Sequence, residues 1–286
     1  MVTAGRPMAA CRFPLKGFPP MRSCPLCRSS QHKLFMKVDA HLLLRCKRCG
    51  FVFHGNPPNL ADEQQEYERY FSAPPSGEYR RDSSDANLRW LWSINQRRLE
   101  FIKSCAHGDR LLDVGCGRGY FLHHARSFGF HPHGIDISST AADYAAERFG
   151  LSVTVANIEI QSAEGAFDVI TLWHVLEHFH EPVRALQTLR HLLPRQGILI
   201  IEVPNLNDLK FRLAPPAFRW RGGNHPRLHR SFFTAATLAS ALNRAGFHCR
   251  FYSPRYPAPF IKTALKGILN RFNLDSFLEV IAFPKP

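Results

Sequence analysis

Four of the eight cysteines stand in two closely spaced pairs near the N-terminus. Cys24 and Cys27 are separated by two residues, and Cys46 and Cys49 repeat that spacing 18 residues later. Two thiolates at this spacing can bind one ion from a tight turn, and two such turns complete the tetrahedral sulfur site that Zn²⁺ prefers. We therefore predict a structural zinc in a small ribbon module at residues 21–55. A site with four thiolates is closed, so we expect no catalysis there.

A second chemically informative segment is the glycine-rich stretch Gly115–Gly119, which follows the apolar run 110–114. Glycines let the backbone approach a ligand closely, and a helix beginning after them adds partial positive charge. Asp136 lies 23 residues after Asp113, at the end of the next predicted strand. A carboxylate there can accept hydrogen bonds from both hydroxyls of a ribose. The combination predicts a nucleoside cofactor without distinguishing which one.

A third group, His174, Glu177 and His178, has the i, i+3, i+4 spacing of a single helix face. If this turn is helical, the three side chains can supply a general base or bind a divalent metal. A structural, hydrogen-bonded role is the remaining interpretation.

Residues 205–232 form an insertion that leaves the carboxyl end of a predicted strand, where ligands of open α/β sheets bind. Its arginines and histidines suit an anionic substrate, and its glycine pair would permit movement of a lid. A basic, solvated loop is the alternative. Our candidates for the catalytic base are His178, His225 and His229.

The elements that would position these residues alternate along the chain. We expect helices at 85–104, 120–128, 139–149, 182–193 and 234–245, and strands at 110–114, 133–137, 152–156, 167–172, 197–203, 249–253 and 277–283. This order predicts an α/β fold, a Rossmann-like, doubly wound, mostly parallel seven-stranded sheet behind the small zinc ribbon.

Composition limits the interpretation further. We expect a disordered leader at 1–20, a linker and helix at 56–104, and the main domain at 105–286. No apolar run is long enough for a transmembrane helix, and a formal charge of +14 permits nucleic acid, anionic membranes or acidic substrates as partners. The remaining cysteines follow no pairing pattern, which favours a reducing, cytoplasmic location.

Several motifs resemble those of class I S-adenosylmethionine-dependent methyltransferases. Leu111–Gly119 looks like their first motif and Phe167–His178 like their fourth-strand motif, while Pro194–Leu199 and Ser231–Phe247 are similar to later segments. The cysteine module ahead of this domain resembles bacterial methyltransferases of sugars and other small metabolites. Val175–His178 is also similar to quinone-biosynthesis O-methyltransferases.

The resemblance implies S-adenosylmethionine as cofactor and methyl transfer to a small-molecule acceptor, such as a nucleotide-linked sugar or another anionic metabolite. It places the glycine loop against the methionine part, Asp136 on the ribose and Ile137 against the adenine. Asn157 stands where the family commonly has Asp, and its carbonyl oxygen can accept from the adenine amino group. The implied cofactor-binding residues are Asp113, Gly115, Gly117, Gly119, Asp136, Ile137, Asn157, Trp173 and His174.

Three rival functions remain open: an RNA methyltransferase, a non-catalytic cofactor-binding module and a nicotinamide oxidoreductase. Against the first, the fourth-strand motif lacks the Asn/Asp-Pro-Pro-aromatic signature of amino-group nucleic-acid methyltransferases. A basic amphipathic segment at 260–272 would serve as a lid, a dimer contact, a membrane-surface helix or a helix packed on the sheet.

Overall fold

The computed structural model describes residues 22–72, 85–160, 165–213, 226–252 and 276–286. Four predictions fall outside those ranges, namely those for the leader 1–20, the glycine pair Gly222 and Gly223 of the insertion, His225 and the segment 260–272.

A seven-stranded sheet in the order β10-β11-β8-β7-β4-β5-β6 forms the centre of the main domain. Its strands are β4 (Arg110–Val114), β5 (His131–Asp136), β6 (Val153–Val155), β7 (Val169–Trp173), β8 (Ile198–Pro204), β10 (Phe247–Tyr252) and β11 (Phe277–Pro284). Neighbouring strands from β6 to β8 are parallel, whereas β11 runs antiparallel to both of its neighbours. The fold predicted from the sequence is therefore confirmed.

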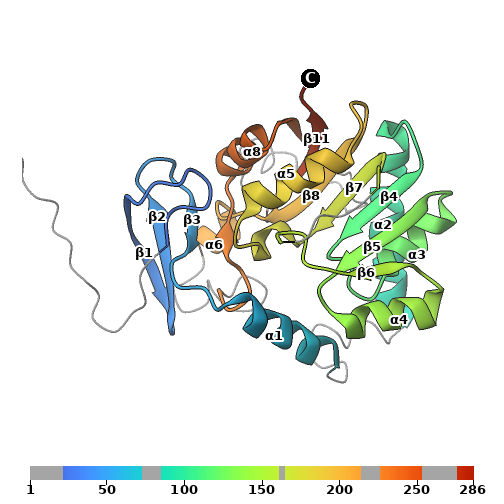
Figure 1. Cartoon of the computed structure of the whole chain (residues 1–286), viewed down its shortest axis with the longest axis horizontal. Coiled ribbons are helices and arrows are strands. Elements are labelled where there is room, and N and C mark those ends of the chain that lie inside the picture. Colours follow the sequence, from blue (N-terminus) through green and yellow to red (C-terminus); the bar gives the residue numbers. More distant parts are fainter. Residues whose placement is uncertain (1–21, 73–84, 161–164, 214–225, 253–275) are drawn as a thin grey trace, which may run out of the picture.

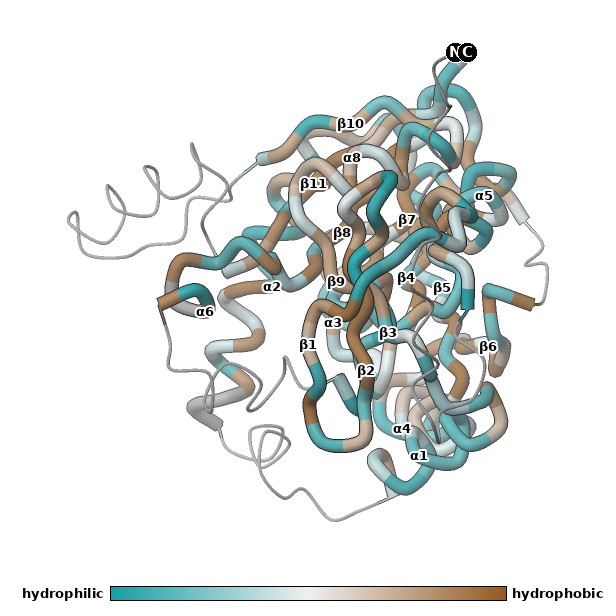
Figure 2. Tube along the Cα trace, turned by 90° about the vertical axis from the view of Figure 1, so that its left-hand side faces the viewer, coloured by the Kyte–Doolittle hydropathy of each residue, from teal (hydrophilic) through white to brown (hydrophobic). Residues whose placement is uncertain are grey.

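Helices cover both faces of this sheet, so its central strands are apolar on both sides. One hydrophobic cluster packs helices α5 (Pro182–Leu192) and α8 (Ala235–Arg244) on one face. A second cluster packs α2 (Asp85–Cys105), α3 (Tyr120–Ser127) and α4 (Ser139–Phe149) on the other. Figure 1 shows the two groups on opposite sides of the strands, and Figure 2 shows apolar residues concentrated in the strands.

Local sequence determines where two of these helices begin. The Ser138 hydroxyl accepts a hydrogen bond from the Ala141 N–H (3.2 Å) and so caps the start of α4. Thr234 and Thr237 form a reciprocal capping box at the start of α8.

The N-terminal residues 22–55, here called the cysteine module, form a second, smaller sheet. Its strands are β1 (His32–Val38), β2 (His41–Cys46), β3 (Val52–His54) and β9 (Ser231–Phe232). Strand β9 comes from the insertion of the main domain and pairs with β3 through Val52 and Phe232. The alternating sequence pattern did not predict this pairing.

The cysteine module also shares its interior with the main domain. Phe51 and Phe53 are fully buried in the same hydrophobic cluster as Leu238 and Leu242 of α8. The Phe51 ring lies 5.2 Å from the ring of Phe233, which directly follows β9. The two regions are therefore packed as one body.

Helix α1 (Leu60–Ser72) connects the module to the main domain and lies against α4. The Glu68 carboxylate accepts hydrogen bonds from the N–H groups of Ser139 (2.7 Å) and Thr140 (3.3 Å), at the positively polarised start of α4. Two short elements complete the description, α6 (Leu209–Leu213) and the 3₁₀ helix η2 (Leu176–His178). Within the described ranges, no helix has the length and apolarity needed to cross a membrane.

Candidate functional site

The glycine loop between β4 and α3 has the backbone shape that its sequence requires. Gly115, Gly117 and Gly119 all have positive φ angles, of 69°, 50° and 76°. A Cβ atom at Gly115 would lie 2.5 Å from a methyl group of Val175, so a larger residue does not fit without a shift. Glycine is thus required both for conformation and for close approach to the segment after β7.

Asp136 at the end of β5 organises this loop. Its carboxylate accepts one hydrogen bond from the Gly117 N–H (2.8 Å) and another from the Ser138 N–H (3.0 Å). Burial raises the pKa of Asp136, and these N–H groups oppose that rise. Each carboxylate oxygen has a second lone pair, so the group can still accept from a ribose hydroxyl. The geometry therefore fits a nucleoside at the carboxyl ends of β4 and β5.

Four other predicted cofactor residues lie around the same edge of the sheet. Asp113 is buried and accepts a hydrogen bond from Thr171 Oγ1 (2.6 Å), and burial raises its pKa to about 7. Ile137 is half-buried, and its carbonyl accepts from the Gln64 amide (3.4 Å).

Asn157 uses its side-chain oxygen locally, accepting from the Glu159 N–H at 2.9 Å. The Trp173 ring lies under the Arg98 guanidinium at 3.9 Å from the ring centre. Its indole N–H is buried without a hydrogen-bond partner in the described part of the chain. A buried donor of this kind is available to a ligand.

His174 does not share a helix face with Glu177 and His178, because η2 begins after it. It has a left-handed backbone (φ 58°), and its Nε2 lies 2.7 Å from Glu202 Oε1. Its Nδ1 lies 3.7 Å from Glu177 Oε1. Burial lowers the pKa of His174, but the two carboxylates outweigh that effect and raise it to about 9. His174 is therefore an imidazolium held between two acids.

His178 lies in a different environment, next to Tyr67 of α1 and the insertion. Its Nδ1 is 2.8 Å from the Tyr67 hydroxyl and 3.1 Å from the carbonyl oxygen of Leu228. Because that carbonyl can only accept, we assign the ring hydrogen to Nδ1, which leaves the lone pair on Nε2. Burial lowers the pKa of His178, so this lone pair is available at neutral pH.

His229 completes the cluster from the insertion. Its ring lies 4.9 Å from the His178 ring and nearly perpendicular to it. Burial lowers the pKa of His229 to about 3, so both rings are neutral at pH 7. Sequence reasoning predicted the two histidines but missed Tyr67, which lies in a polar helix without a motif. No sequence signal could have found it, because the contact depends on how α1 lies across the main domain.

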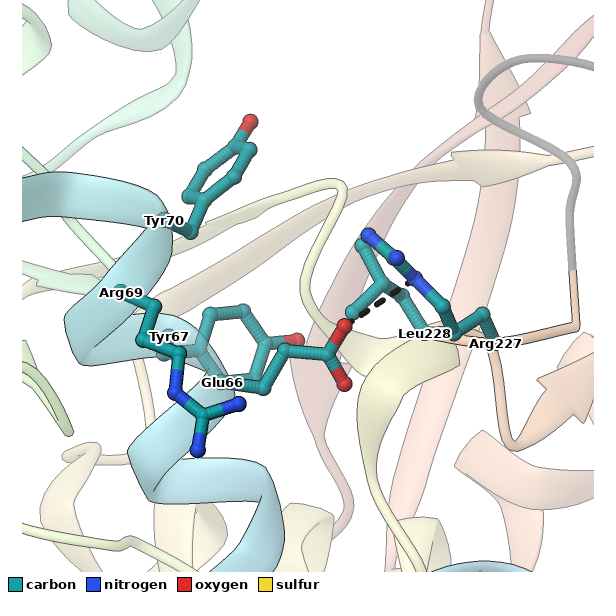
Figure 3. Close-up of a pocket in the computed structure, with 6 residues that line it drawn as sticks. All are labelled: Glu66, Tyr67, Arg69, Tyr70, Arg227 and Leu228. Atoms are coloured by element: carbon teal, nitrogen blue, oxygen red, sulfur yellow. Dashed lines mark ion pairs between the residues drawn. The ribbon is translucent and has the colours of Figure 1, made fainter. Parts of the chain in front are cut away.

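A pocket opens beside this cluster, between α1 and the insertion. Figure 3 shows Glu66 and Tyr67 pointing from α1 toward the insertion. Arg227 pairs with Glu66 at 3.0 Å on the pocket's edge. The residues that line the pocket are Glu66, Tyr67, Arg69, Tyr70, Arg227 and Leu228.

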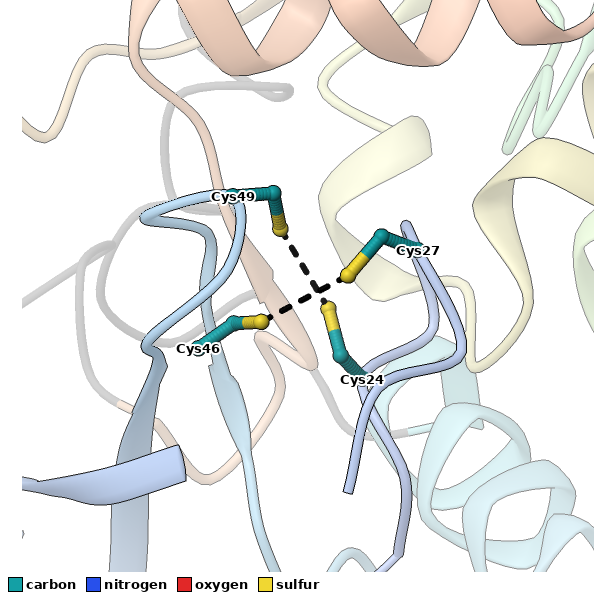
Figure 4. Close-up of side chains that lie close together, drawn as sticks. All are labelled: Cys24, Cys27, Cys46 and Cys49. Carbon is teal, nitrogen blue, oxygen red and sulfur yellow. Dashed lines mark hydrogen bonds between the residues drawn. The ribbon is translucent and has the colours of Figure 1, made fainter. Parts of the chain in front are cut away.

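The four cysteines of the module are arranged as a metal site would require. Their sulfur atoms point toward one another from two turns (Figure 4), with Cys24 and Cys49 at 3.6 Å and Cys27 and Cys46 at 3.5 Å. Zinc–sulfur bonds of about 2.3 Å in a tetrahedron place sulfur atoms about 3.8 Å apart. The thiols therefore fit Zn²⁺ closely.

Glu177, His178 and His229 form a second group whose donor atoms all lie within 4.8 Å of one another. At this separation, the charge of the carboxylate acts directly on the two imidazole rings.

Comparison with known proteins identifies the family of the main domain. A methyltransferase domain family matches residues 85–250, more than half of the chain. A ubiquinone biosynthesis O-methyltransferase of Paraburkholderia xenovorans (strain LB400) is 31% identical over 139 residues, which is 46% of this chain and 60% of that relative. The relative from Xanthomonas euvesicatoria pv. vesicatoria (strain 85-10) is 27% identical over 212 residues, 69% of this chain and 84% of its own length.

The chain thus spans only 60% of the length of the first of these relatives. Solved structures agree on the fold. Magnesium protoporphyrin IX methyltransferase from Synechocystis PCC 6803, solved with bound SAH, superposes with a TM-score of 0.55 at 14% identity, covering 79% of this chain and all of that one.

Proposed function

Because this chain belongs to the methyltransferase domain family, we propose that it transfers a methyl group from S-adenosylmethionine to a small-molecule acceptor. The observation that carries the proposal is the glycine loop, in which the Gly117 N–H donates a hydrogen bond to the Asp136 carboxylate at the edge of the sheet. The histidine cluster follows the next central strand, β7, at that edge. A cofactor at the loop would therefore lie near a possible base.

Bound S-adenosylmethionine would supply an already activated sulfonium methyl group. The residues suited to hold it are Gly115, Gly117 and Asp136, together with Trp173, whose indole N–H has no hydrogen-bond partner among the described residues. The protein then has to align a nucleophile with the methyl carbon and accept a proton where the nucleophile carries one.

We propose His178 as the group that accepts this proton, with Tyr67 and His229 as its neighbours. The Nε2 lone pair is free in the assigned tautomer, and burial lowers the pKa, so the ring is neutral before reaction. Tyr67 contacts Nδ1 and orients the ring. His225, in the same insertion, stays a further candidate.

For the acceptor, we propose an anionic hydroxyl compound, such as a nucleotide-linked sugar. Two arginines, Arg69 and Arg227, line the pocket with one acid, Glu66, which pairs with Arg227. The excess positive charge supports an anion, because guanidinium groups bind phosphates and carboxylates in two-point contacts. The curated relatives are O-methyltransferases by name, which favours oxygen as the methylated atom.

We also propose that the cysteine module is a zinc ribbon whose metal is structural. The four sulfur atoms converge from two turns, and four thiolates leave no open position for chemistry. None of the seven cysteines in the described ranges forms a disulfide. That state suits a reducing compartment, so we propose the cytoplasm.

The test is methyl transfer from tritiated S-adenosylmethionine by the full-length, zinc-loaded protein. The acceptors offered are nucleotide-linked sugars, hydroxybenzoates and total RNA. We expect label in a small anionic hydroxyl compound and none in RNA. Label in RNA alone would contradict the proposal, as would failure of S-adenosylhomocysteine to bind the folded protein.

A further inference from the structure

Glu177 is a buried acid whose carboxylate accepts no hydrogen bond within the described ranges. Its side chain is only 2% exposed, and neither carboxylate oxygen has a hydrogen-bond partner there. The nearest cation is His174, whose Nδ1 lies 3.7 Å away. An ionised group in such a place is costly unless surrounding charges compensate it.

A row of alternating charges keeps this carboxylate ionised. Arg98 of α2 donates to Glu202 Oε1 at 2.7 Å, and the same oxygen lies 2.7 Å from His174 Nε2. His174 turns its other nitrogen toward Glu177 and lowers the pKa of that carboxyl, against the effect of burial. The left-handed backbone of His174 brings its ring between the two acids.

On its other side, Glu177 faces the two neutral histidines. Donor atoms of Glu177, His178 and His229 lie within 4.8 Å of one another, so the carboxylate adjoins both rings. The other charged or titratable groups that act on these histidines are His174 and the buried Arg230, while Tyr67 contacts His178 directly. Among them, only Glu177 offers a negative charge to the pair.

We propose that Glu177 is the residue that prepares the histidine pair for proton transfer, because its carboxylate compensates the imidazolium that forms when His178 accepts the acceptor's proton. The inference rests on the proposed function. In that step the hydroxyl proton moves to His178 Nε2 while the acceptor oxygen bonds the methyl carbon. The electron pair of the broken carbon–sulfur bond stays on sulfur.

The proposal assigns different tasks to the two acids of the charge row. Glu202 pairs with His174, and His174 pairs with Glu177. Glu202 and His174 therefore act on the base only through Glu177. Glu177 acts on the base itself and is a positioning residue, since it need not touch the acceptor. Replacement of Glu177 should therefore change proton affinity and turnover while leaving cofactor affinity unchanged.

The test compares the wild type with Glu177→Gln, using Glu100→Gln on the exposed side of α2 as a matched control. Histidine ring carbons labelled with ¹³C are titrated by NMR in the zinc-loaded protein with S-adenosylhomocysteine bound. We expect the midpoint of His178 to fall by at least one pH unit in Glu177→Gln, a tenfold loss of proton affinity, and Glu177→Asp to restore part of it. Unchanged midpoints in a folded Glu177→Gln would overturn the inference.

A second readout follows once an acceptor is found. In Glu177→Gln we expect kcat to fall about tenfold or more, KM for S-adenosylmethionine to stay constant, and the acid limb of the pH profile to move to lower pH. A fall in kcat with an unmoved acid limb would contradict the assigned role. The NMR titration needs no turnover, so it tests Glu177 even if no acceptor is methylated.

Discussion

Glu63 and Arg230 form a buried ion pair that joins helix α1 to the insertion, one residue from His229. The Arg230 side chain is 1% exposed and also donates to the carbonyl oxygen of Arg227 at 2.8 Å. The Arg230 carbonyl accepts from the backbone N–H of His54 in the cysteine module. Three regions of the chain therefore meet beside the proposed base.

Breaking this pair should be costly. Glu63→Gln leaves a guanidinium buried without its counter-charge, and we expect a loss of about 3–5 kcal/mol in the free energy of unfolding. Glu66→Gln, on the same helix, breaks a half-exposed pair with Arg227 and should cost about 1 kcal/mol or less. Urea unfolding of the zinc-loaded proteins measures both. If the two variants lost equal free energy of unfolding, the buried Arg230 would not need the charge of Glu63.

Asp136 should govern binding of the cofactor. Asp136→Asn loses the charge that holds the Gly117 N–H and would hold a ribose, so we expect the Kd for S-adenosylhomocysteine to rise about tenfold or more, roughly 1.4 kcal/mol. Calorimetry measures this directly. Asp168→Asn, at the opposite end of β7, is the control and should bind as the wild type does. If Asp136→Asn bound S-adenosylhomocysteine as tightly as the wild type, the glycine loop would not be part of the cofactor site.

The cysteine module should contain one zinc ion per chain. Cys27→Ser replaces a buried thiolate with a weak ligand, so we expect loss of the metal and a lower Tm, because the module shares its core with α8. Elemental analysis and thermal unfolding measure the two effects. Cys105→Ser, far from the cluster in sequence, should retain the metal. Wild-type protein that folds fully without zinc would contradict the assignment.

His174 should make stability depend on pH. Its folded pKa of about 9 exceeds the unfolded value near 6.5, so its contribution is complete below pH 6.5 and disappears as the pH rises through 9. The side chain is 38% exposed, which screens the effect to on the order of 1 kcal/mol. We expect His174→Gln to be less stable than the wild type at pH 6 and nearly equal at pH 9.5. If the loss of stability in His174→Gln grew as the pH rose, His174 would not be positively charged in the folded protein.

Tyr67 should matter for turnover and not for the cofactor. Tyr67→Phe keeps the ring but removes the hydroxyl beside His178 Nδ1, so we expect kcat to fall about tenfold with unchanged affinity for S-adenosylhomocysteine. Turnover with the acceptor from the tritium screen and calorimetry together measure this. If Tyr67→Phe had the kcat of the wild type, the Tyr67 hydroxyl would not be needed to orient His178, and the Leu228 carbonyl would suffice.

Much of the fold was predictable because it depends on local patterns. Strand β4 reads as a short apolar run before glycines, and Ser138 and Thr234 mark helix starts by their capping side chains. These signals lie within a few residues of the elements that they determine. The spacing of the cysteines is local in the same sense, and the four sulfur atoms do converge.

The rest of the candidate site depends on contacts between distant residues. The i, i+3, i+4 spacing suggested that His174 and His178 share a face, but the helical turn begins only at Leu176, and the His174 side chain pairs with Glu202 instead. Tyr67 reaches His178 only because α1 lies across the main domain. No spacing in the sequence encodes either contact.

The pairing of β3 with β9 also determines when the small sheet can form during synthesis. Val52 leaves the ribosome well before its partner Phe232, which is made 180 positions later. Contacts so distant in sequence form slowly. The four cysteine thiols beside β3 would thus be made long before β9, so early capture of zinc would protect them from oxidation during translation.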